Sequence, residues 1–463
     1  WLMLRTIWPK HVQATAAMAL LFLLYPGILQ ESRAFIFGFF WLQLSLIFLS
    51  FSIMARVVRE PKFRFTFTAI SLLCVLPTWF MGEYFIGLEI LRPLVLWKLI
   101  SKKDNHVKPR LYATIKYWLP YFIGLCIYLF WRILLFETTR EEVNPSSFTS
   151  KFLTDPVHEL LLRIEFVAPD IVKATLLTWI QPLSHDLLQT TSLSTWLAWS
   201  VGIIVGLITY FSLIGIIPNY YPGSKNHLDQ NSRFCKELVA SGIIAIIVGM
   251  LPIWFSGVDI GLAGMETRYA LPAIVGACFL LYGLLRMIVC SWQQMTLLLS
   301  VLCSLATATH IKAANDFRHE WLHQQQLFWQ LAWRAPDLTP NTLLWIHREG
   351  WQTKRWPTPY PDIHYAAPIN LMYKKNNTPH KLNYWATSLD QDDKALQFQN
   401  DISHSYEKQT RNLEFSRAPK HNLIVTLTPP SCLRILDQNA QQSAYSPQLP
   451  PEIVRLSNTD LII

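Results

Sequence analysis

The chain has 463 residues, of which 51% are hydrophobic and only 15% are Asp, Glu, Lys or Arg, and its formal net charge is +9. Because soluble domains average about 25% charged residues, this composition excludes an ordinary soluble protein and indicates a membrane protein. Much of the basic excess lies between apolar segments, which argues for membrane orientation and against nucleic acid as a partner. The seven cysteines form no CxxC pair, so neither a zinc site nor a disulfide framework is expected.

Stretches without charged residues recur along the first two thirds of the chain. A helix of about 20 apolar residues crosses the hydrocarbon layer of a membrane, where a charge is costly. The pattern predicts an α-helical polytopic membrane bundle with about nine spans. We place them at residues 12–29, 34–54, 66–82, 84–100, 115–135, 196–217, 238–255, 268–288 and 291–310.

The connections between these spans are alternately basic and poor in Lys and Arg. The basic connections follow the second, fourth, sixth and eighth spans, and the positive-inside rule therefore makes them cytoplasmic. An odd number of spans then places the tail outside. The sequence thus predicts a membrane domain at 1–311 and an external soluble domain at 312–463, in the plasma membrane of a bacterium. The chain opens at Trp1 without an initiator methionine, and we expect an N-terminal truncation.

The external connection at 137–195 is long enough to hold structure of its own. Val157, Leu160, Leu161 and Ile164 follow helical spacing after Asp155-Pro156, and a second apolar piece at 171–183 contains Trp179. Amphipathic helices lying flat on the outer leaflet fit this pattern. Ordinary packing of the same residues against neighbouring spans remains an alternative.

The tail predicts a helix followed by strands. Aromatic residues recur at helical intervals over 317–333, and Pro336 ends this helix. Residues 342–346, 422–427 and 432–436 are rich in strand formers, which predicts a smaller α/β or mostly β domain. The tail has no Gly-rich phosphate loop, HExxH or GxSxG motif, and its histidines are scattered, so no metal site is predicted.

Charged residues gather at the predicted outer ends of the spans. A pair within one span, Glu89 and Arg92, lies three residues apart on one helical face, so it predicts either a buried ion pair or a carboxylate lining a polar cavity. Glu31 and Glu83 lie at short external turns, where they line an outward-facing cavity or are simply solvated. The candidate cavity-lining residues are Glu31, Arg33, Glu83, Glu89, Asp259 and Glu266.

This placement suits an enzyme that takes a lipid-linked substrate from the outer leaflet. A carboxylate there can act as general base on an acceptor hydroxyl, and a cation can hold the phosphate of the departing lipid. Arg268 and Tyr269 are the phosphate-binding candidates, since a guanidinium can donate two parallel hydrogen bonds to two phosphate oxygens. Alternatively, Arg268 pairs with Glu266 or Asp259, or extends to the lipid headgroups.

Two short motifs carry a family resemblance. Tyr25-Pro26 ends a span and is followed by the acidic Glu31 and a second span, and Arg268-Tyr269, with Pro272 behind it, opens a late span. With the long external connection and external tail, these resemble the GT-C class of integral-membrane glycosyltransferases, which includes the protein O-mannosyltransferases. The resemblance covers roughly residues 12–310.

The resemblance implies transfer of a sugar from a polyprenyl-phosphate carrier to an acceptor on the extracytoplasmic face. In the class the catalytic carboxylate lies in the first external loop, which here would precede Trp1, so no catalytic residue is assigned within the chain. Membrane lipids and a lipid-linked sugar are the expected partners, while the donor sugar, the acceptor and any divalent metal are left open. The alternatives are a non-catalytic membrane anchor or assembly protein that displays the tail, and a transporter or flippase of lipid-linked glycans.

Overall fold

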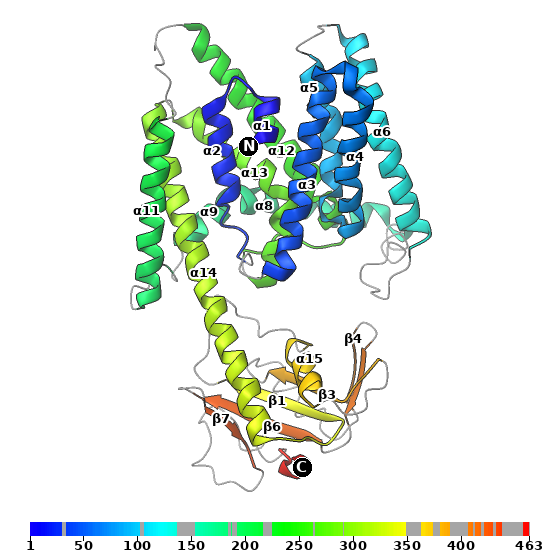
Figure 1. Cartoon of the computed structure of the whole chain (residues 1–463), viewed down its shortest axis with the longest axis vertical. Helices are drawn as coiled ribbons and strands as arrows, with labels where there is room; N and C mark the ends of the chain where they lie inside the picture. The colour runs from blue at the N-terminus through cyan, green and yellow to red at the C-terminus, as the bar shows by residue number, and fades with distance from the viewer. Residues whose placement is uncertain are drawn as a thin grey trace. The chain divides into compact units, whose positions relative to one another are not determined.

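The computed structural model divides the chain into two compact units, Trp1–Asn315 (unit 1) and Asp316–Ile463 (unit 2). Figure 1 shows helices in unit 1 and a mixture of strands and helices in unit 2. The structure describes residues 1–29, 34–101, 106–136, 153–183, 187, 192–215, 225–262, 264–289, 291–348, 363–373, 380–388, 406–410, 413–417, 421–428, 432–437 and 457–462.

Unit 1 consists of helices. Its α-helices and one π-helix (η4) are α1 (Leu2–Ile7), α2 (Val12–Leu23), α3 (Ala34–Arg59), α4 (Arg64–Met81), α5 (Leu91–Ile100), α6 (Val107–Leu134), α8 (Pro156–Val172), η4 (Lys173–Leu177), α9 (Thr178–Ile180), α11 (Leu193–Gly215), α12 (Lys225–Phe255), α13 (Ile274–Ile288) and α14 (Trp292–Arg334), which continues into unit 2. The 3-10 helices of unit 1 are η1 (Pro61–Phe63), η2 (Glu83–Ile90), η5 (Gln181–Leu183) and η6 (Gly264–Ala273).

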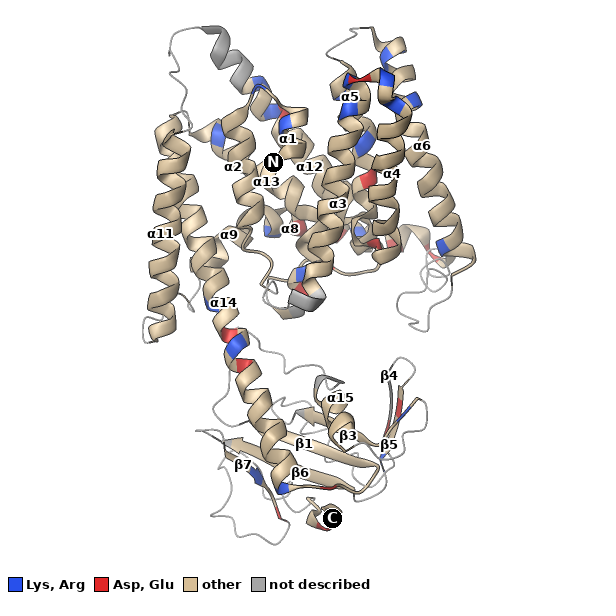
Figure 2. Cartoon of the chain, viewed as in Figure 1, with Lys and Arg blue, Asp and Glu red and all other residues tan. Residues whose placement is uncertain are grey.

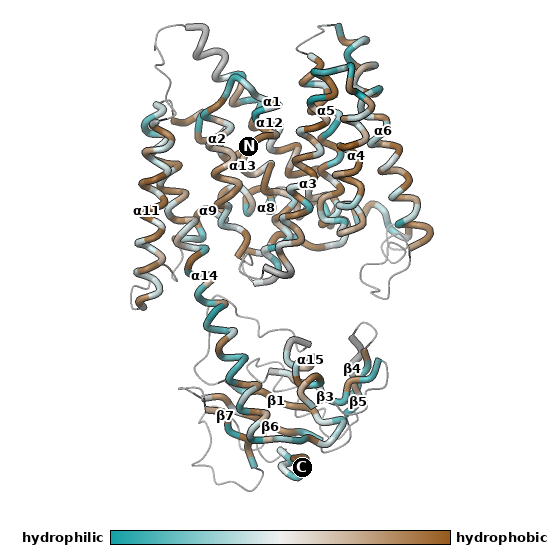
Figure 3. The backbone as a smooth tube through the Cα atoms, viewed as in Figure 1, coloured by the Kyte–Doolittle hydropathy of each residue, from teal (hydrophilic) through white to brown (hydrophobic). Residues whose placement is uncertain are grey.

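Within the described residues, seven helices are long and apolar enough to cross a membrane. They are Phe37–Arg59, Pro61–Met81, Val107–Leu134, Leu193–Gly215, Ser232–Phe255, Glu266–Ile288 and Trp292–Arg334. Their apolar stretches are visible along the helices of Figure 3. This number and composition are those of an integral multi-pass membrane protein, as the sequence predicted.

Two of the nine predicted spans, the first and the fourth, are not single long helices. The first predicted span is the short α2, whose 12 residues rise about 18 Å. It ends just before Pro26, because proline disfavours a helical conformation in the residue before it. The fourth predicted span is the 3-10 helix η2 followed by the 10-residue α5. Pro93 lacks the N–H that would bond to the carbonyl of Glu89 in a continuous α-helix, which gives a physical reason for the change of helix type.

Basic residues concentrate at one end of unit 1. Figure 2 shows Lys and Arg side by side where α3 leads to α4 and where α5 leads to α6. We call this end the basic end and the other the opposite end. The basic connections after the second and fourth predicted spans thus share one end of the bundle, the spatial arrangement that the alternation requires.

The centre of unit 1 is the close contact between α12 and α13. A Cβ built on Gly276 would lie 2.6 Å from the carbonyl oxygen of Gly242 and 2.6 Å from the backbone nitrogen of Ile246, so only glycine fits there. Around this contact, α13 buries every residue from Ile274 to Gly283. Small residues at a helix crossing let backbones approach closely, which is the usual basis of helix association in membranes.

Helix α8 presents its apolar stripe to the surroundings of the chain. Asp155 caps the helix by accepting a hydrogen bond from the backbone N–H of His158, at 3.1 Å. Val157, Leu160 and Ile164 are all exposed, whereas Phe166 and Val167 further along contact the main core. The exposed stripe is therefore available to the lipid interface rather than used in packing within the chain.

Unit 2 is an α/β structure with two small sheets. The strands are β1 (Thr342–Arg348), β2 (Lys381–Leu382), β3 (Tyr384–Ser388), β4 (Tyr406–Thr410), β5 (Leu413–Arg417), β6 (Asn422–Thr428) and β7 (Cys432–Ile435), and the helices after α14 are α15 (Ile363–Met372) and the 3-10 helix η8 (Thr459–Leu461). One sheet has the order β3-β1-β6-β7, with β7 antiparallel to its neighbour and the others parallel; the second has the order β2-β5-β4. The three strands predicted in the tail are confirmed.

Both faces of the four-stranded sheet are covered. Leu327 and Leu331 of α14 and Ile369 of α15 join one buried cluster with the sheet residues Leu344 and Val425. On the other face, Trp385 of β3 stacks on Phe415 of the second sheet, with ring centroids 6.2 Å apart.

The helix predicted over 317–333 is confirmed as the last part of α14, and Arg334 ends it two residues before Pro336.

Candidate functional site

Segments far apart in the sequence meet at the opposite end of unit 1. The hydroxyl of Tyr25, at the end of α2, donates to the carbonyl oxygen of Ala174 in η4 at 2.7 Å. Gly27 approaches η4–α9 so closely that a Cβ there would lie 2.3 Å from the Oγ1 of Thr178. The Tyr25-Pro26 turn that carried the family resemblance is therefore fixed against the segment after α8 and contributes to this end of the bundle.

Arg268 and Tyr269 lie together in η6, at the start of a membrane-spanning segment. The Nη2 of Arg268 donates to the hydroxyl of Tyr269 at 3.0 Å, and the guanidinium lies 5.0 Å from the centroid of that ring. Tyr269 is in turn parallel to Tyr84 of η2, with centroids 6.3 Å apart and an interplanar angle of 7°. Two tyrosine rings and one guanidinium thus form a contiguous group, which we call the Arg268 group.

The charge of Arg268 is not neutralised by a carboxylate among the described residues. No carboxylate oxygen of that part of the chain lies within 4.0 Å of its nitrogens, and its buried Nε has no hydrogen-bond partner there. Arg268 thus forms no direct ion pair with Glu266 or Asp259, and the charge of Glu266 acts on it only from a greater distance. A half-buried guanidinium with donors to spare is suited to an anionic ligand.

A second charged group joins α8–η4 to the segment that follows α12, and its central residues, Asp170 and Lys173, are not among those predicted from the sequence. Asp170 is fully buried and accepts from the indole Nε1 of Trp254 at 2.8 Å and from the backbone N–H of Ile260 at 3.2 Å. Lys173 lies between Asp170, at 3.3 Å, and Asp259, at 2.5 Å. The sequence feature that could have indicated this group is a single acidic residue, Asp170, within an apolar stretch.

Electrostatics hold Lys173 in its charged form. Partial burial alone lowers the pKa of this ammonium, but the hydrogen bond and charge of Asp259, together with Asp170, raise it above the ordinary value of 10.5. Asp259 keeps about half of its side chain exposed. The predicted cavity residue Asp259 is thus an ion-pair partner at the surface, and its carboxylate helps to fix η4.

The remaining predicted residues divide between this end and the interior. Glu83 forms an ion pair with Arg132, which joins the start of η2 to the end of α6. Glu266 is exposed and lies against Gly261. Glu31 and Arg33 lie outside the described residues, so the structure does not place them.

Glu89 is in the interior, in a buried ion pair with Arg92. Nη2 of Arg92 donates to Oε1 of Glu89 at 3.0 Å and to the hydroxyl of Ser50 at 2.9 Å. The guanidinium also lies 4.4 Å from the ring centroids of both Phe51 and Tyr121. The ion pair that the spacing predicted is present, and the Ser50 hydroxyl and the two rings add favourable contacts that offset part of the cost of burying the guanidinium.

Comparison with protein-family models, with curated proteins and with solved structures finds no match to this chain. No group of three or more His, Cys, Asp or Glu side chains in the described part of the chain is arranged to hold a metal ion. The chemistry open to this end of unit 1 therefore follows from the Arg268 group: a guanidinium beside two tyrosine rings can recognise an anion.

Proposed function

We propose that the chain is a membrane glycosyltransferase of the GT-C type, which transfers a sugar from a polyprenyl-phosphate carrier to an acceptor at the extracytoplasmic face. The observation that carries this proposal is Arg268, a half-buried guanidinium without a carboxylate partner among the described residues. It lies at a span end, the depth at which the phosphate of a lipid carrier lies. Charge-assisted, bidentate hydrogen bonds make arginine the preferred ligand of phosphate.

The proposed reaction requires one bond to form and one to break. The acceptor oxygen bonds to the anomeric carbon of the sugar, the bond from that carbon to the phosphate oxygen breaks, and its electron pair stays on the phosphate. Arg268 would stabilise this developing charge, while the acceptor proton passes to a general base. Asp170, Asp259 and Glu83 are all engaged in ion pairs, which makes them unsuited to this role, and the base is left unassigned.

The topology that goes with this function has nine crossings. The eight residues of η2 and ten of α5 together rise about 31 Å, enough to cross a hydrocarbon layer of about 30 Å. With α2 as a further, shorter crossing, the seven long helices make nine. The basic end then faces the cytoplasm, and unit 2 and the Arg268 group face outward, in a bacterial plasma membrane.

The alternative function, a membrane anchor that displays unit 2, has the same topology but does not require Arg268 to bind a phosphate. Binding of a polyprenyl phosphate to the full chain in nanodiscs, measured by native mass spectrometry, separates the two. Arg268→Gln should weaken binding about 10- to 100-fold, since a hydrogen bond to a charged group is worth about 1.5–3 kcal/mol. The affinity of Arg268→Lys should lie between those of the unaltered protein and Arg268→Gln, because lysine keeps the positive charge but cannot donate two parallel hydrogen bonds to the phosphate.

The matched control is Arg132→Lys, which changes an arginine that is already paired with Glu83 at the same end of unit 1. It should bind the polyprenyl phosphate as the unaltered protein does. Equal binding by the unaltered protein and Arg268→Gln would refute the assignment of the phosphate to Arg268.

A further inference from the structure

The first residues of α4 lie against α6 at the basic end of unit 1. The guanidinium of Arg64, where α4 begins, lies 5.4 Å from the ring centroid of Tyr117 on α6. Lys116 precedes Tyr117 and is exposed, and its ammonium lies 6.0 Å from the ring centroid of Tyr112, one turn nearer the start of the helix. Two cations from two helices thus flank one tyrosine, in the basic region that Figure 2 shows at these helix ends. We call Arg64, Tyr112, Lys116 and Tyr117 the α4–α6 surface.

Neither cation of this surface is neutralised within the part of the chain that the structure describes. There, Arg64 and Lys116 have no carboxylate oxygen within 4.0 Å, and their contacts are those with the tyrosine rings. Glu60, the acidic residue nearest to Arg64 in sequence, is exposed and forms no ion pair with a described cation. A guanidinium has five N–H donors and an ammonium has three, so both residues keep donors for an anion.

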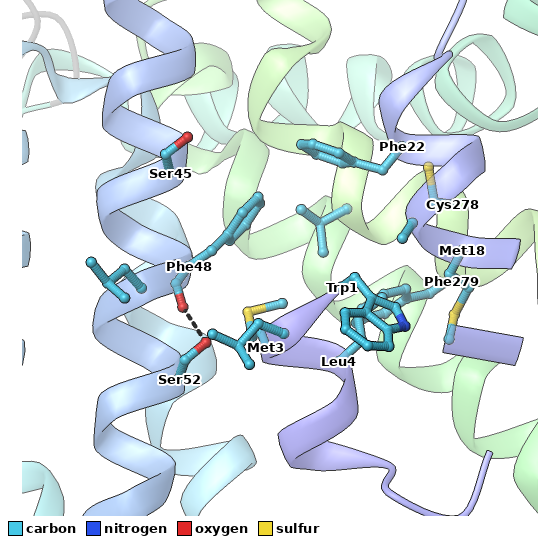
Figure 4. Close-up of a pocket in the computed structure, with 14 residues that line it drawn as sticks. Trp1, Met3, Leu4, Met18, Phe22, Ser45, Phe48, Ser52, Cys278 and Phe279 are labelled. Atoms are coloured by element: carbon cyan, nitrogen blue, oxygen red, sulfur yellow. Dashed lines mark hydrogen bonds between the residues drawn. The ribbon is translucent and has the colours of Figure 1, made fainter. Parts of the chain in front are cut away.

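Two polar side chains on the neighbouring helices are instead bound within the protein. The hydroxyl of Ser52 on α3 donates to the carbonyl oxygen of Phe48 at 2.8 Å, as Figure 4 shows. The Nε of Arg110 on α6 donates to the carbonyl oxygen of Trp97 on α5 at 3.0 Å, and its guanidinium lies 3.9 Å from the centroid of that ring. Arg64 and Lys116 differ from these neighbours because their hydrogen-bonding capacity is left for a ligand.

The two cations lie at the depth of lipid headgroups. Lys116 and Arg132 are the charged residues that bound the apolar stretch of α6, and they are 16 residues, or about 24 Å, apart. Since the hydrocarbon layer is about 30 Å thick, each lies within about 3 Å of a boundary when this stretch is centred, a distance that a long basic side chain covers. Arg64 lies beside Tyr117 and therefore shares the depth of Lys116.

From Lys116 toward the middle of the membrane, the exposed face of α6 is apolar. Leu119, Ile123 and Ile127 follow Lys116 at intervals of three and four residues, which places them on one face of the helix, and all three are exposed. On the other side of Lys116, Tyr112 is exposed on the same face. The face thus changes from phenol and ammonium to hydrocarbon in the direction in which a phospholipid changes from headgroup to acyl chain.

We propose that the α4–α6 surface binds an anionic glycerophospholipid of the leaflet at the basic end. Its phosphate accepts hydrogen bonds from Arg64 and Lys116, and one acyl chain lies along Leu119 and Ile123. Charge complementarity selects an anionic lipid over a zwitterionic one, because the ammonium of a zwitterionic headgroup is repelled by the two cations. The site is at the other end of unit 1 from the Arg268 group, so it is independent of the proposed transferase reaction.

The test counts the lipids bound to the full chain in detergent by native mass spectrometry. Phosphatidylglycerol should bind at least 10-fold more tightly than phosphatidylcholine, because each Lys or Arg near an anionic headgroup strengthens binding about 5-fold. The double variant Arg64→Gln/Lys116→Gln should reduce this preference at least 5-fold. The matched control, Arg233→Gln/Lys236→Gln, removes two exposed cations from α12 and should keep it. Equal binding of the two phospholipids, a double variant with the full preference, or a control that loses as much would overturn the proposal.

A measurement without substitution guards against a variant that does not fold. A phosphatidylglycerol with a photoreactive group in its acyl chain should crosslink to peptides that contain Leu119 or Ile123, and crosslinking confined to other peptides would contradict the proposal. Displacement by millimolar inorganic phosphate would assign the surface to a free anion, and displacement by equimolar polyprenyl phosphate would assign it to a polyprenyl carrier. Either result would overturn the phospholipid assignment, and neither bears on the comparison of Arg268→Gln with the unaltered protein.

Discussion

Replacing Arg92 by methionine should destabilise unit 1 more than replacing an arginine or lysine in an exposed ion pair. Arg92 and Glu89 expose 0% and 3% of their side chains, so the substitution would leave a carboxylate buried without its cation. Methionine has a similar length and keeps much of the packing against Phe51 and Tyr121, which isolates the electrostatic loss from the loss of volume.

The magnitude follows from what remains around Glu89. Removing one partner of a buried ion pair costs about 3–5 kcal/mol, because the other charge stays desolvated. Ser50 does not add greatly to this, since its hydroxyl keeps a partner in Ser71 at 2.8 Å. Arg92→Met should therefore lower the free energy of unfolding by about 3–5 kcal/mol. The double variant Glu89→Gln/Arg92→Met carries no buried charge and should recover at least about 2 kcal/mol of that loss.

Equilibrium unfolding of the full chain in mixed micelles, followed by circular dichroism, measures these differences. The control is Lys98→Met, whose ion pair with Glu237 exposes 23% and 42% of the two side chains and should contribute only about 0–1 kcal/mol. A loss below about 1 kcal/mol for Arg92→Met, or a double variant no more stable than the single one, would show that Glu89 is solvated. The cavity-lining interpretation of Glu89 would then replace the ion-pair interpretation.

Three further predictions use other parts of the fold. Lys173→Met should lower the free energy of unfolding by about 1–3 kcal/mol. The lost contribution is complete below pH 10.5 and disappears in the unaltered protein as the pH rises through the elevated pKa of Lys173, so unfolding measured across that pH range checks the prediction. Gly206→Leu should disrupt the packing of α11 on α14 by about 1–3 kcal/mol, because its Cβ would lie 3.0 Å from that of Ser304, whereas Gly215→Leu should be tolerated. In unit 2, burial raises the pKa of Tyr384 to about 12, so stability should fall between pH 10 and pH 12, and the Tyr384→Phe variant should lack that component.

The sequence predicted the class of fold well, because membrane crossing imposes a simple composition rule. Apolar length alone located the helices that cross as single elements, and the charge alternation located the basic end. It did not predict that the fourth span is a 3-10 helix joined to a short α-helix, although Pro93 was visible. Hydrophobicity reports that a segment is buried in lipid or protein, and it does not distinguish one helix type from another.

The candidate site was predicted in part. Arg268 and Tyr269 were chosen as neighbours in sequence, but the partner ring of Tyr84 comes from a segment 185 positions away, and only the fold brings them together. Asp170 and Lys173 were not predicted, because they lie in a connection whose apolar periodicity indicates helices at the lipid interface. Their partners are Asp259 and Trp254, so their importance depends on contacts between distant segments that no local pattern records.

The distribution of polar groups bears on which class of function the chain performs. A transporter needs polar groups that continue through the bundle, and these usually meet the substrate near the midplane. In the described part of unit 1, the interior charges Glu89 and Arg92 satisfy each other, and the α12–α13 contact is closed by backbone packing at Gly242 and Gly276. The guanidinium with spare donors is instead at one end, beside two tyrosine rings. A protein built in this way is better suited to act on a lipid phosphate at one face than to carry a solute across, which is why a transferase is the function we propose.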